Sequence, residues 1–131
     1  MGRILAIDVG EKRVGLAMTD ELCIIASPYG FVEREKSVDY INNLIHKESI
    51  DHLVVGLPYL PSGGLGGQAV DVKAFVEDLA KVVNLPIEFE NEMLTSVEAE
   101  KRLRVVKPKH EKGDVDAMAA TIILESFLQG K

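Results

Sequence analysis

The order of secondary-structure elements predicted from this sequence is typical of an α/β fold, with a mixed sheet of five strands flanked by helices. Two observations favour this fold. Three extended segments come first, and a short glycine-containing turn separates the first two. Apolar strands then alternate with helical stripes along the rest of the chain. A leading antiparallel group followed by strand–helix alternation implies a mixed sheet covered by helices.

The strands are predicted from short apolar runs. The first is a continuous buried run, and in the second Val14, Leu16 and Met18 alternate with smaller residues. Pro28 and Gly30 interrupt the third. The predicted strands are residues 3–9, 13–19, 22–32, 52–57 and 87–90.

The helices are predicted from apolar stripes and capping signals. Residues 37–48 and 69–83 each place their aliphatic side chains on one helical face. The run Thr95-Ser96-Val97-Glu98 is a capping box, so a third helix should begin there. Gly113-Asp114 introduces a last helix, with Asp114 expected as its N-cap.

Composition limits the class of protein. The 131 residues suffice for one hydrophobic core, and we expect a single domain spanning residues 1–131. No apolar run approaches the roughly 18 residues of a membrane span. The N-terminus also lacks the features of a secretion signal, so we expect a cytoplasmic protein with no membrane partner. Cys23 is the one cysteine, which excludes an internal disulfide; its apolar neighbours predict a small buried side chain.

Charge is distributed unevenly along the chain. The net charge of −6 argues mildly against a general nucleic-acid binder, because such binding depends on neutralising phosphates. One basic segment nevertheless stands out, and it suits either a phosphate ligand or a solvated helix end and loop. Its members are Lys101, Arg102, Arg104, Lys107, Lys109 and Lys112, joined by His110.

Three acidic residues lie at the ends of predicted elements and are candidates for one site. Asp8 ends the first strand, Glu92 follows the last strand, and Asp116 is expected in the first turn of the last helix. Because the carboxyl ends of parallel strands lie on one edge of a sheet, the three should converge. Each acid alone also fits an ordinary role in a turn or at a helix N-terminus. Together, oxygen ligands without a His or Cys cluster indicate Mg²⁺ or Mn²⁺.

With these acids in place, the chain resembles the YqgF family, also called RuvX-like proteins, from Ile4 to Leu128. The resemblance implies an RNase H-like fold and hydrolysis of nucleic-acid phosphodiester bonds. It also implies that Asp8, Glu92 and Asp116 are catalytic and bind the metal, most simply as two ions that activate water and stabilise the leaving oxygen. The segments that carry the resemblance are Asp8 to Ala17, Val54 to Pro58, Gly64 to Ala69, Glu92 to Ala99 and Asp116 to Ala120.

The resemblance also indicates substrates. It implies maturation of the 5′ end of pre-16S rRNA, with an rRNA precursor and ribosomal particles as partners. The alternatives are cleavage of branched DNA at Holliday junctions, and a non-catalytic RNA-binding assembly factor with a vestigial site. The family usually has Asp-Glu-Arg where this chain has Asn91-Glu92-Met93, which favours the non-catalytic alternative a little. A sugar-kinase-like phosphotransferase would need two such domains, and this chain has the length of one.

Further residues are predicted to contact the substrate backbone. Arg13 is favoured over Lys12 in the first turn, because a planar guanidinium matches phosphate. Gly64 and Gly67 belong to a glycine-rich loop before a helix, which is either a phosphate cradle or a linker. With no tryptophan, base-stacking side chains should be scarce. The remaining predicted contacts are Thr95, Arg104, Lys107 and Lys109.

Overall fold

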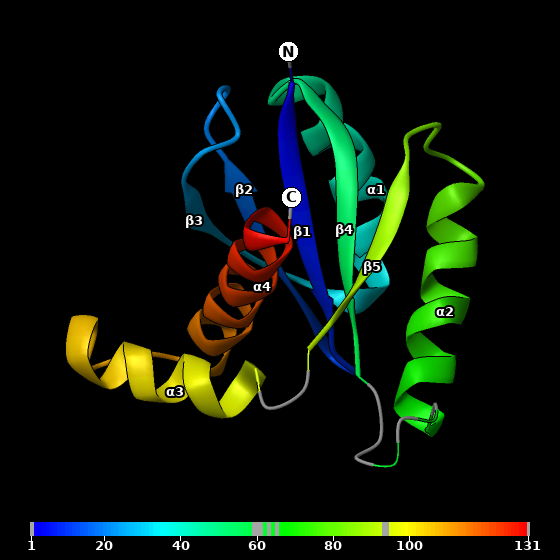
Figure 1. The fold of residues 1–131 in the computed structure, drawn as a ribbon. Helices are drawn as coiled ribbons and strands as arrows, with labels where there is room; N and C mark the ends of the chain where they lie inside the picture. Colours follow the sequence, from blue (N-terminus) through cyan, green and yellow to red (C-terminus); the bar gives the residue numbers. More distant parts are fainter. Residues whose placement is uncertain (1, 59–61, 63, 65, 93–94, 131) are drawn as a thin grey trace.

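The computed structural model describes residues 2–58, 62, 64, 66–92 and 95–130, and it confirms the predicted α/β class and element order. Five strands form one sheet in the order β3-β2-β1-β4-β5 (Figure 1). The pairs β1–β2 and β2–β3 are antiparallel, whereas β1–β4 and β4–β5 are parallel, so the sheet is mixed. The strands are β1 (Arg3–Val9), β2 (Arg13–Thr19), β3 (Ala26–Glu33), β4 (Ile50–Leu57) and β5 (Ile87–Asn91).

Helices cover both faces of the sheet. The last helix, α4, crosses one face, α1 and α2 lie against the other, and α3 extends away from the sheet beside α4 (Figure 1). No helix in the described part of the chain is both long and apolar enough to span a membrane. The helices are α1 (Arg34–Lys47), α2 (Gly67–Ala80), α3 (Thr95–Val106) and α4 (Lys112–Gln129).

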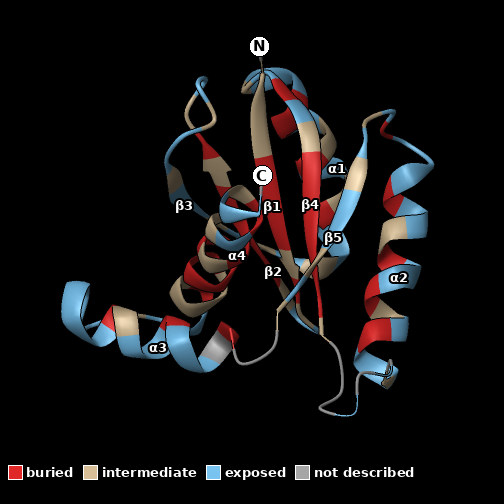
Figure 2. Cartoon of the chain, viewed as in Figure 1, coloured by how far each residue is buried: buried red, intermediate tan, exposed pale blue. Residues whose placement is uncertain are grey.

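The two faces of the sheet differ in side-chain size. Leu5 and Ile7 of β1 belong to the large core that α1 and α2 cover. Ala6, which lies between them in the strand, packs instead with Ala17 and Ala120 under α4. Figure 2 shows the buried residues concentrated on the central strands and on the helix faces that meet them. Because side chains alternate along a strand, Asp8 lies on the α4 face with Ala6.

The third strand begins later than predicted. Residues 22–25 were expected to be extended, but β3 begins at Ala26 and this segment is a turn. The Asp20 carboxylate accepts the backbone N–H groups of Ile24 and Ile25 at 2.8 and 2.9 Å, which fixes the turn. Leu22 and Ile24 are consequently 67% exposed. The expectation of a buried Cys23 is also wrong, because this residue is half-buried with a φ of 57°.

The last helix begins earlier than predicted. Glu111, and not Asp114, is the N-cap of α4. Asp114 occupies the third helical position, where its carboxylate accepts the Glu111 N–H at 3.0 Å and completes a capping box. Asp116 therefore lies at the start of the second turn, one position beyond the expected first turn.

Candidate active site

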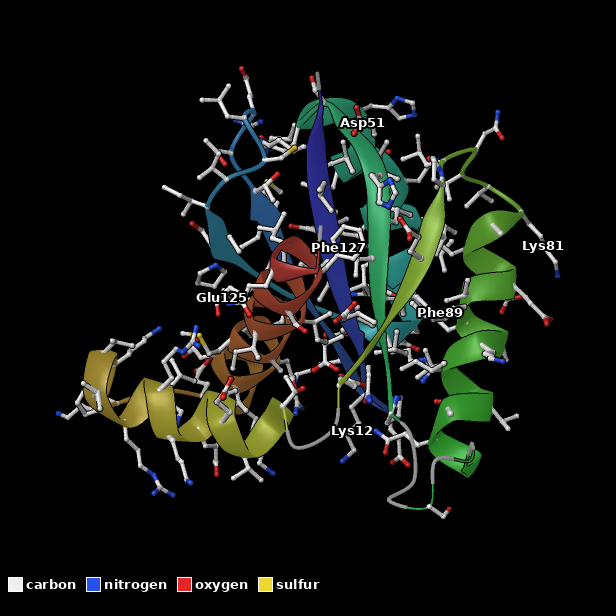
Figure 3. The ribbon with its side chains drawn as sticks, viewed as in Figure 1. Lys12, Asp51, Lys81, Phe89, Glu125 and Phe127 are labelled. Atoms are coloured by element: carbon white, nitrogen blue, oxygen red, sulfur yellow. The ribbon has the colours of Figure 1, made fainter. Side chains whose placement is uncertain are left out.

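The candidate site lies at the edge of the sheet where β1, β4 and β5 end. The parallel pairing of these strands brings their carboxyl ends together. Figure 3 shows Lys12, in the turn after β1, at this edge and Asp51, near the start of β4, at the opposite one. The chain therefore gathers on one edge the turn that follows Asp8 and the segment that contains Glu92.

A hydrogen bond joins the carboxyl groups of Asp8 and Glu92, and both residues are half-buried. Desolvation raises the pKa of Asp8 to about 6, with a smaller contribution from the charge of Asp116. Desolvation and then the charge of Asp8 raise the pKa of Glu92 to about 9. Both pKa values are raised, so the pair shares one proton near neutral pH.

Two neighbours position Glu92. Gly56 of β4 has no side chain where the carboxylate lies, since a Cβ there would be 2.7 Å from Glu92 Oε2. The Thr95 hydroxyl, in the first residue of α3, donates a hydrogen bond to the Glu92 backbone carbonyl at 2.8 Å. Thr95 was predicted to contact substrate; it is buried in the structure, where it holds the Glu92 backbone.

Asp116 approaches the acid pair from α4. Its Oδ2 accepts the Arg13 Nε–H at 2.8 Å, an ion pair between residues 103 positions apart. Gly15 allows this approach, because a Cβ on Gly15 would collide with the Asp116 carbonyl. The Arg13 side chain makes no other hydrogen bond with a described residue, so its two Nη groups remain available.

The carboxylate oxygens of the three acids are suitable ligands for a hard divalent cation, but the three side chains do not form a preformed metal site. Among the described residues, no three His, Cys, Asp or Glu side chains are arranged to hold a metal ion together. In the metal-free protein the Arg13 guanidinium pairs with Asp116, and one proton halves the charge of the Asp8–Glu92 pair. Two desolvated carboxyls that retain a proton are a donor set in which a divalent cation can replace that proton.

Arg34 is a residue of this edge that the sequence reasoning missed. Its guanidinium makes a bidentate ion pair with Asp71 of α2, at 2.7 and 2.9 Å. Nη1 also donates to the Gly10 carbonyl at 3.0 Å, and the Arg34 backbone N–H donates to the Lys12 carbonyl at 2.9 Å. One side chain therefore ties the turn after Asp8 to the second turn of α2. No local signal identifies this bond, because Arg34 and Asp71 are 37 positions apart.

The other predicted phosphate contacts differ in their availability. Lys12 is exposed, and Gly67 begins α2 with open space around it. Gly64 is also exposed, while Gly63 and Leu65 of the same loop lie outside the described residues. Lys107 is held by Asp114 at 3.1 Å. Arg104 and Lys109 are exposed and pair with no described acid.

Solved structures share this fold. Thermus thermophilus RuvC in complex with a Holliday junction substrate matches with a TM-score of 0.63 and 12% sequence identity, covering 99% of this chain and 96% of that one. A second Thermus thermophilus RuvC structure matches with a TM-score of 0.56 and 14% identity, covering 98% of this chain and 95% of that one. The chain therefore has the RNase H-like fold of these RuvC structures.

Sequence comparison identifies the family. The model for RuvX, described as "Holliday junction resolvase", matches residues 2–130, so the chain belongs to the RuvX family. A Roseiflexus relative is 38% identical and covers 99% of this chain and 96% of its own length. A Trichormus variabilis relative is 43% identical over 95% of this chain and 85% of its own length. Both are named "Putative pre-16S rRNA nuclease". The chain is thus a nuclease by family, and the resemblance inferred from its motifs is confirmed.

Proposed function

We propose that this chain hydrolyses phosphodiester bonds of a 16S rRNA precursor with the help of divalent cations, in the cytoplasm. Asp8, Glu92 and Asp116 are the proposed cation ligands, and the substrate is nucleic acid. The observation that carries the proposal is the hydrogen-bonded Asp8–Glu92 pair with Asp116 close enough to raise the pKa of Asp8. A group of acids that disfavours its own full ionisation is suited to a cation.

Bound Mg²⁺ or Mn²⁺ would supply a Lewis acid for the phosphoryl oxygen and would lower the pKa of a water molecule. The residues of the chain provide the setting for this chemistry. The Asp8–Glu92 pair shares a proton in the metal-free site and must release it before all three acids can act as ligands. Arg13, whose two Nη groups are available, can donate to a phosphate oxygen while its Nε positions Asp116.

The names of the relatives support an rRNA precursor as the substrate. Branched DNA is the second candidate, and the description of the family model favours it. Ribosomal particles are the expected context only if the first candidate holds. Lys12, Gly64, Gly67, Arg104 and Lys109 remain the proposed contacts to the nucleic-acid backbone, because all five are exposed.

The test is a cleavage assay with purified protein, Mg²⁺ or Mn²⁺, and two substrates: a 16S rRNA precursor and a four-way DNA junction. We expect Asp8→Asn and Asp116→Asn to lower the rate by at least roughly a thousandfold, because each loses a charge that binds the cation. Asp51→Asn is the matched control, since this exposed acid lies at the opposite edge of the sheet (Figure 3).

The same variants can be tested without a substrate. Millimolar Mn²⁺ should raise the melting temperature of the wild type by binding only the folded site, and Asp8→Asn should lose most of this rise. An Asp8→Asn protein that cleaves at the wild-type rate would remove Asp8 from the mechanism. Cleavage of the junction but not of the precursor would identify the second candidate as the substrate.

A further inference from the structure

Phe31 is an exposed aromatic side chain next to the candidate site. It lies on the edge strand β3 and is 42% exposed. Its ring packs against Gly113 in the first turn of α4, so closely that a Cβ on Gly113 would overlap the ring. One side of Phe31 is therefore fixed on the helix that carries Asp116, while a large part of the ring remains open to solvent.

The register of the sheet relates Phe31 to Asp8. Asp8 pairs with Gly15 across β1 and β2, and Gly15 pairs with Phe31 across β2 and β3. Residues paired in this way project from the same face of a sheet. Two strand spacings of about 4.8 Å separate Asp8 from Phe31, or about 10 Å in total. A single nucleic-acid strand can contact both positions.

A hollow of about 670 Å³ lies beside the ring, and Phe31, Lys12 and Arg13 contribute to its lining. Arg13 borders both places, because its Nε binds Asp116 in the candidate site. The cations suit a phosphate, and the ring suits the flat face of a base. Three glutamates complete most of the remaining lining and disfavour a second phosphate there, whereas stacking of a neutral base tolerates them.

Other exposed aromatic residues do not combine these features. Phe31 shares its hollow with Lys12 and Arg13. Phe89 is similarly exposed, at 39%, but it lies on β5, the opposite edge strand (Figure 3). Phe89 is therefore a matched control for exposure and residue type.

We propose that Phe31 stacks on an unpaired base of the nucleic-acid substrate, next to the nucleotide whose phosphate Arg13 contacts. This inference rests on the proposed function and deepens it, because a base can stack on Phe31 only where it is not held in a duplex. The preferred substrate then contains single-stranded nucleotides beside the cleaved bond. Stacking requires a π-face, so RNA and DNA share the required chemistry.

The absence of natural tryptophan allows a direct test. Phe31→Trp and Phe89→Trp each introduce a single tryptophan whose fluorescence is quenched by a stacked base. Titrations use single-stranded oligo(A) and oligo(dA), an abasic oligomer of equal length and an oligo(dA)·oligo(dT) duplex, all in EDTA so that no cleavage occurs. We expect quenching of Phe31→Trp by the two single-stranded oligomers, and little by the abasic oligomer or the duplex. Phe89→Trp should not respond.

Affinity provides the second measurement. Phe31→Leu keeps an apolar side chain against Gly113 and should weaken oligo(A) binding roughly tenfold, while Phe89→Leu should not. Equal quenching by abasic and base-containing oligomers, equal responses of the two tryptophans, absence of oligo(A) binding, or unchanged affinity of Phe31→Leu would each overturn the proposal. Quenching without any cleavage by the wild type in Mn²⁺ would instead refute the nuclease mechanism and leave the stacking site intact.

Discussion

The two faces of the sheet carry different kinds of side chain on the same strands. On the face covered by α1 and α2, Leu5 and Ile7 of β1 are fully buried among large aliphatic side chains. On the α4 face the same strand presents Ala6 and Asp8, and β2 and β4 present Gly15 and Gly56. Small residues let α4 approach the sheet closely and leave space for carboxylates. The face covered by α1 and α2 therefore contributes most of the apolar packing. The α4 face has smaller side chains, which leave room for the candidate active site.

The two faces also differ in charge: one is apolar, and the other carries acidic side chains at its edge. The α1 and α2 face consists of apolar contacts and buries Leu16 and Leu53 completely. The α4 face brings Asp8, Glu92 and Asp116 together at its edge, with Arg13 as a partial counter-charge. Metal-free, this edge should be less stable than an apolar packing would make it. Removing a charge at this edge should therefore raise stability and lower activity, whereas opening a cavity on the apolar face should lower stability.

The largest effect is expected from a pair of adjacent substitutions in β1. Ile7→Ala should lower the free energy of unfolding by about 2–5 kcal/mol, because it opens a cavity in the main core. Asp8→Asn should instead raise the stability of the metal-free protein, since the amide relieves charge repulsion and can donate to Glu92. Urea unfolding in EDTA at pH 7.5 measures both. A metal-free Asp8→Asn protein that is less stable than the wild type would contradict the comparison.

A smaller effect is expected from filling the space next to Glu92. Gly56→Ala should cost about 1–3 kcal/mol by overpacking, because its Cβ would meet the Ile123 side chain and Glu92 Oε2. The same change should displace the Glu92 carboxylate and lower the cleavage rate. Gly130→Ala is the matched control, since a Cβ there would meet its nearest atom, the Phe127 carbonyl oxygen, at an ordinary 3.6 Å. Equal cleavage rates for the two variants would show that Glu92 does not require the gap.

The pH dependence of stability should reveal the shared proton. The pKa values of Asp8 and Glu92 are raised in the folded state, so above pH 5 the folded protein holds a proton that the unfolded chain has released. Stability of the metal-free protein should therefore fall as pH rises from 5 to 8. A full proton of difference corresponds to about 1.4 kcal/mol per pH unit, so the decline over these three units should be roughly 4 kcal/mol.

Two other acids with shifted pKa values, Asp71 and Asp114, should not contribute to this pH dependence. Hydrogen bonds from Arg34 and from the Glu111 backbone lower the pKa of Asp71 and Asp114, respectively, so both acids are ionised in folded and unfolded states above pH 5 and add no slope. Asp8→Asn should flatten the slope. Stability that rises between pH 5 and 8 would exclude a protonated pair.

The smallest effect on stability is expected from the Arg34–Asp71 ion pair, which is partly exposed. Its coupling in a double-mutant cycle with Arg34→Ala and Asp71→Ala should be at most about 1 kcal/mol. Its effect on cleavage should be larger, because the pair positions the turn after Asp8. The Arg102–Glu125 pair between α3 and α4 is the control, with an N–O distance of 2.9 Å. Equal losses of cleavage in the two cycles would assign Arg34 a purely structural role.

The sequence by itself determined the element order, the mixed sheet and the edge at which Asp8 and Glu92 lie. These features follow from local periodicity, from strand ends and from the family motifs. The same reasoning extended the third strand to Leu22, because an apolar run looks alike in a strand and in an exposed turn fixed by Asp20. It also misplaced the N-cap of α4, because both Glu111 and Asp114 can cap a helix.

Only the tertiary structure decided which side chains meet. The proton shared by Asp8 and Glu92, the Arg13–Asp116 ion pair and the Arg34–Asp71 ion pair each join segments that are distant in sequence. The contact between Phe31 and Gly113 likewise depends on how close α4 comes to β3. Periodicity assigns a residue to a face, but the partner of a side chain depends on strand register and on the distance at which a helix packs. Small residues at Gly15 and Gly56 set that distance here, and only the packed structure shows which atoms fill the space they leave.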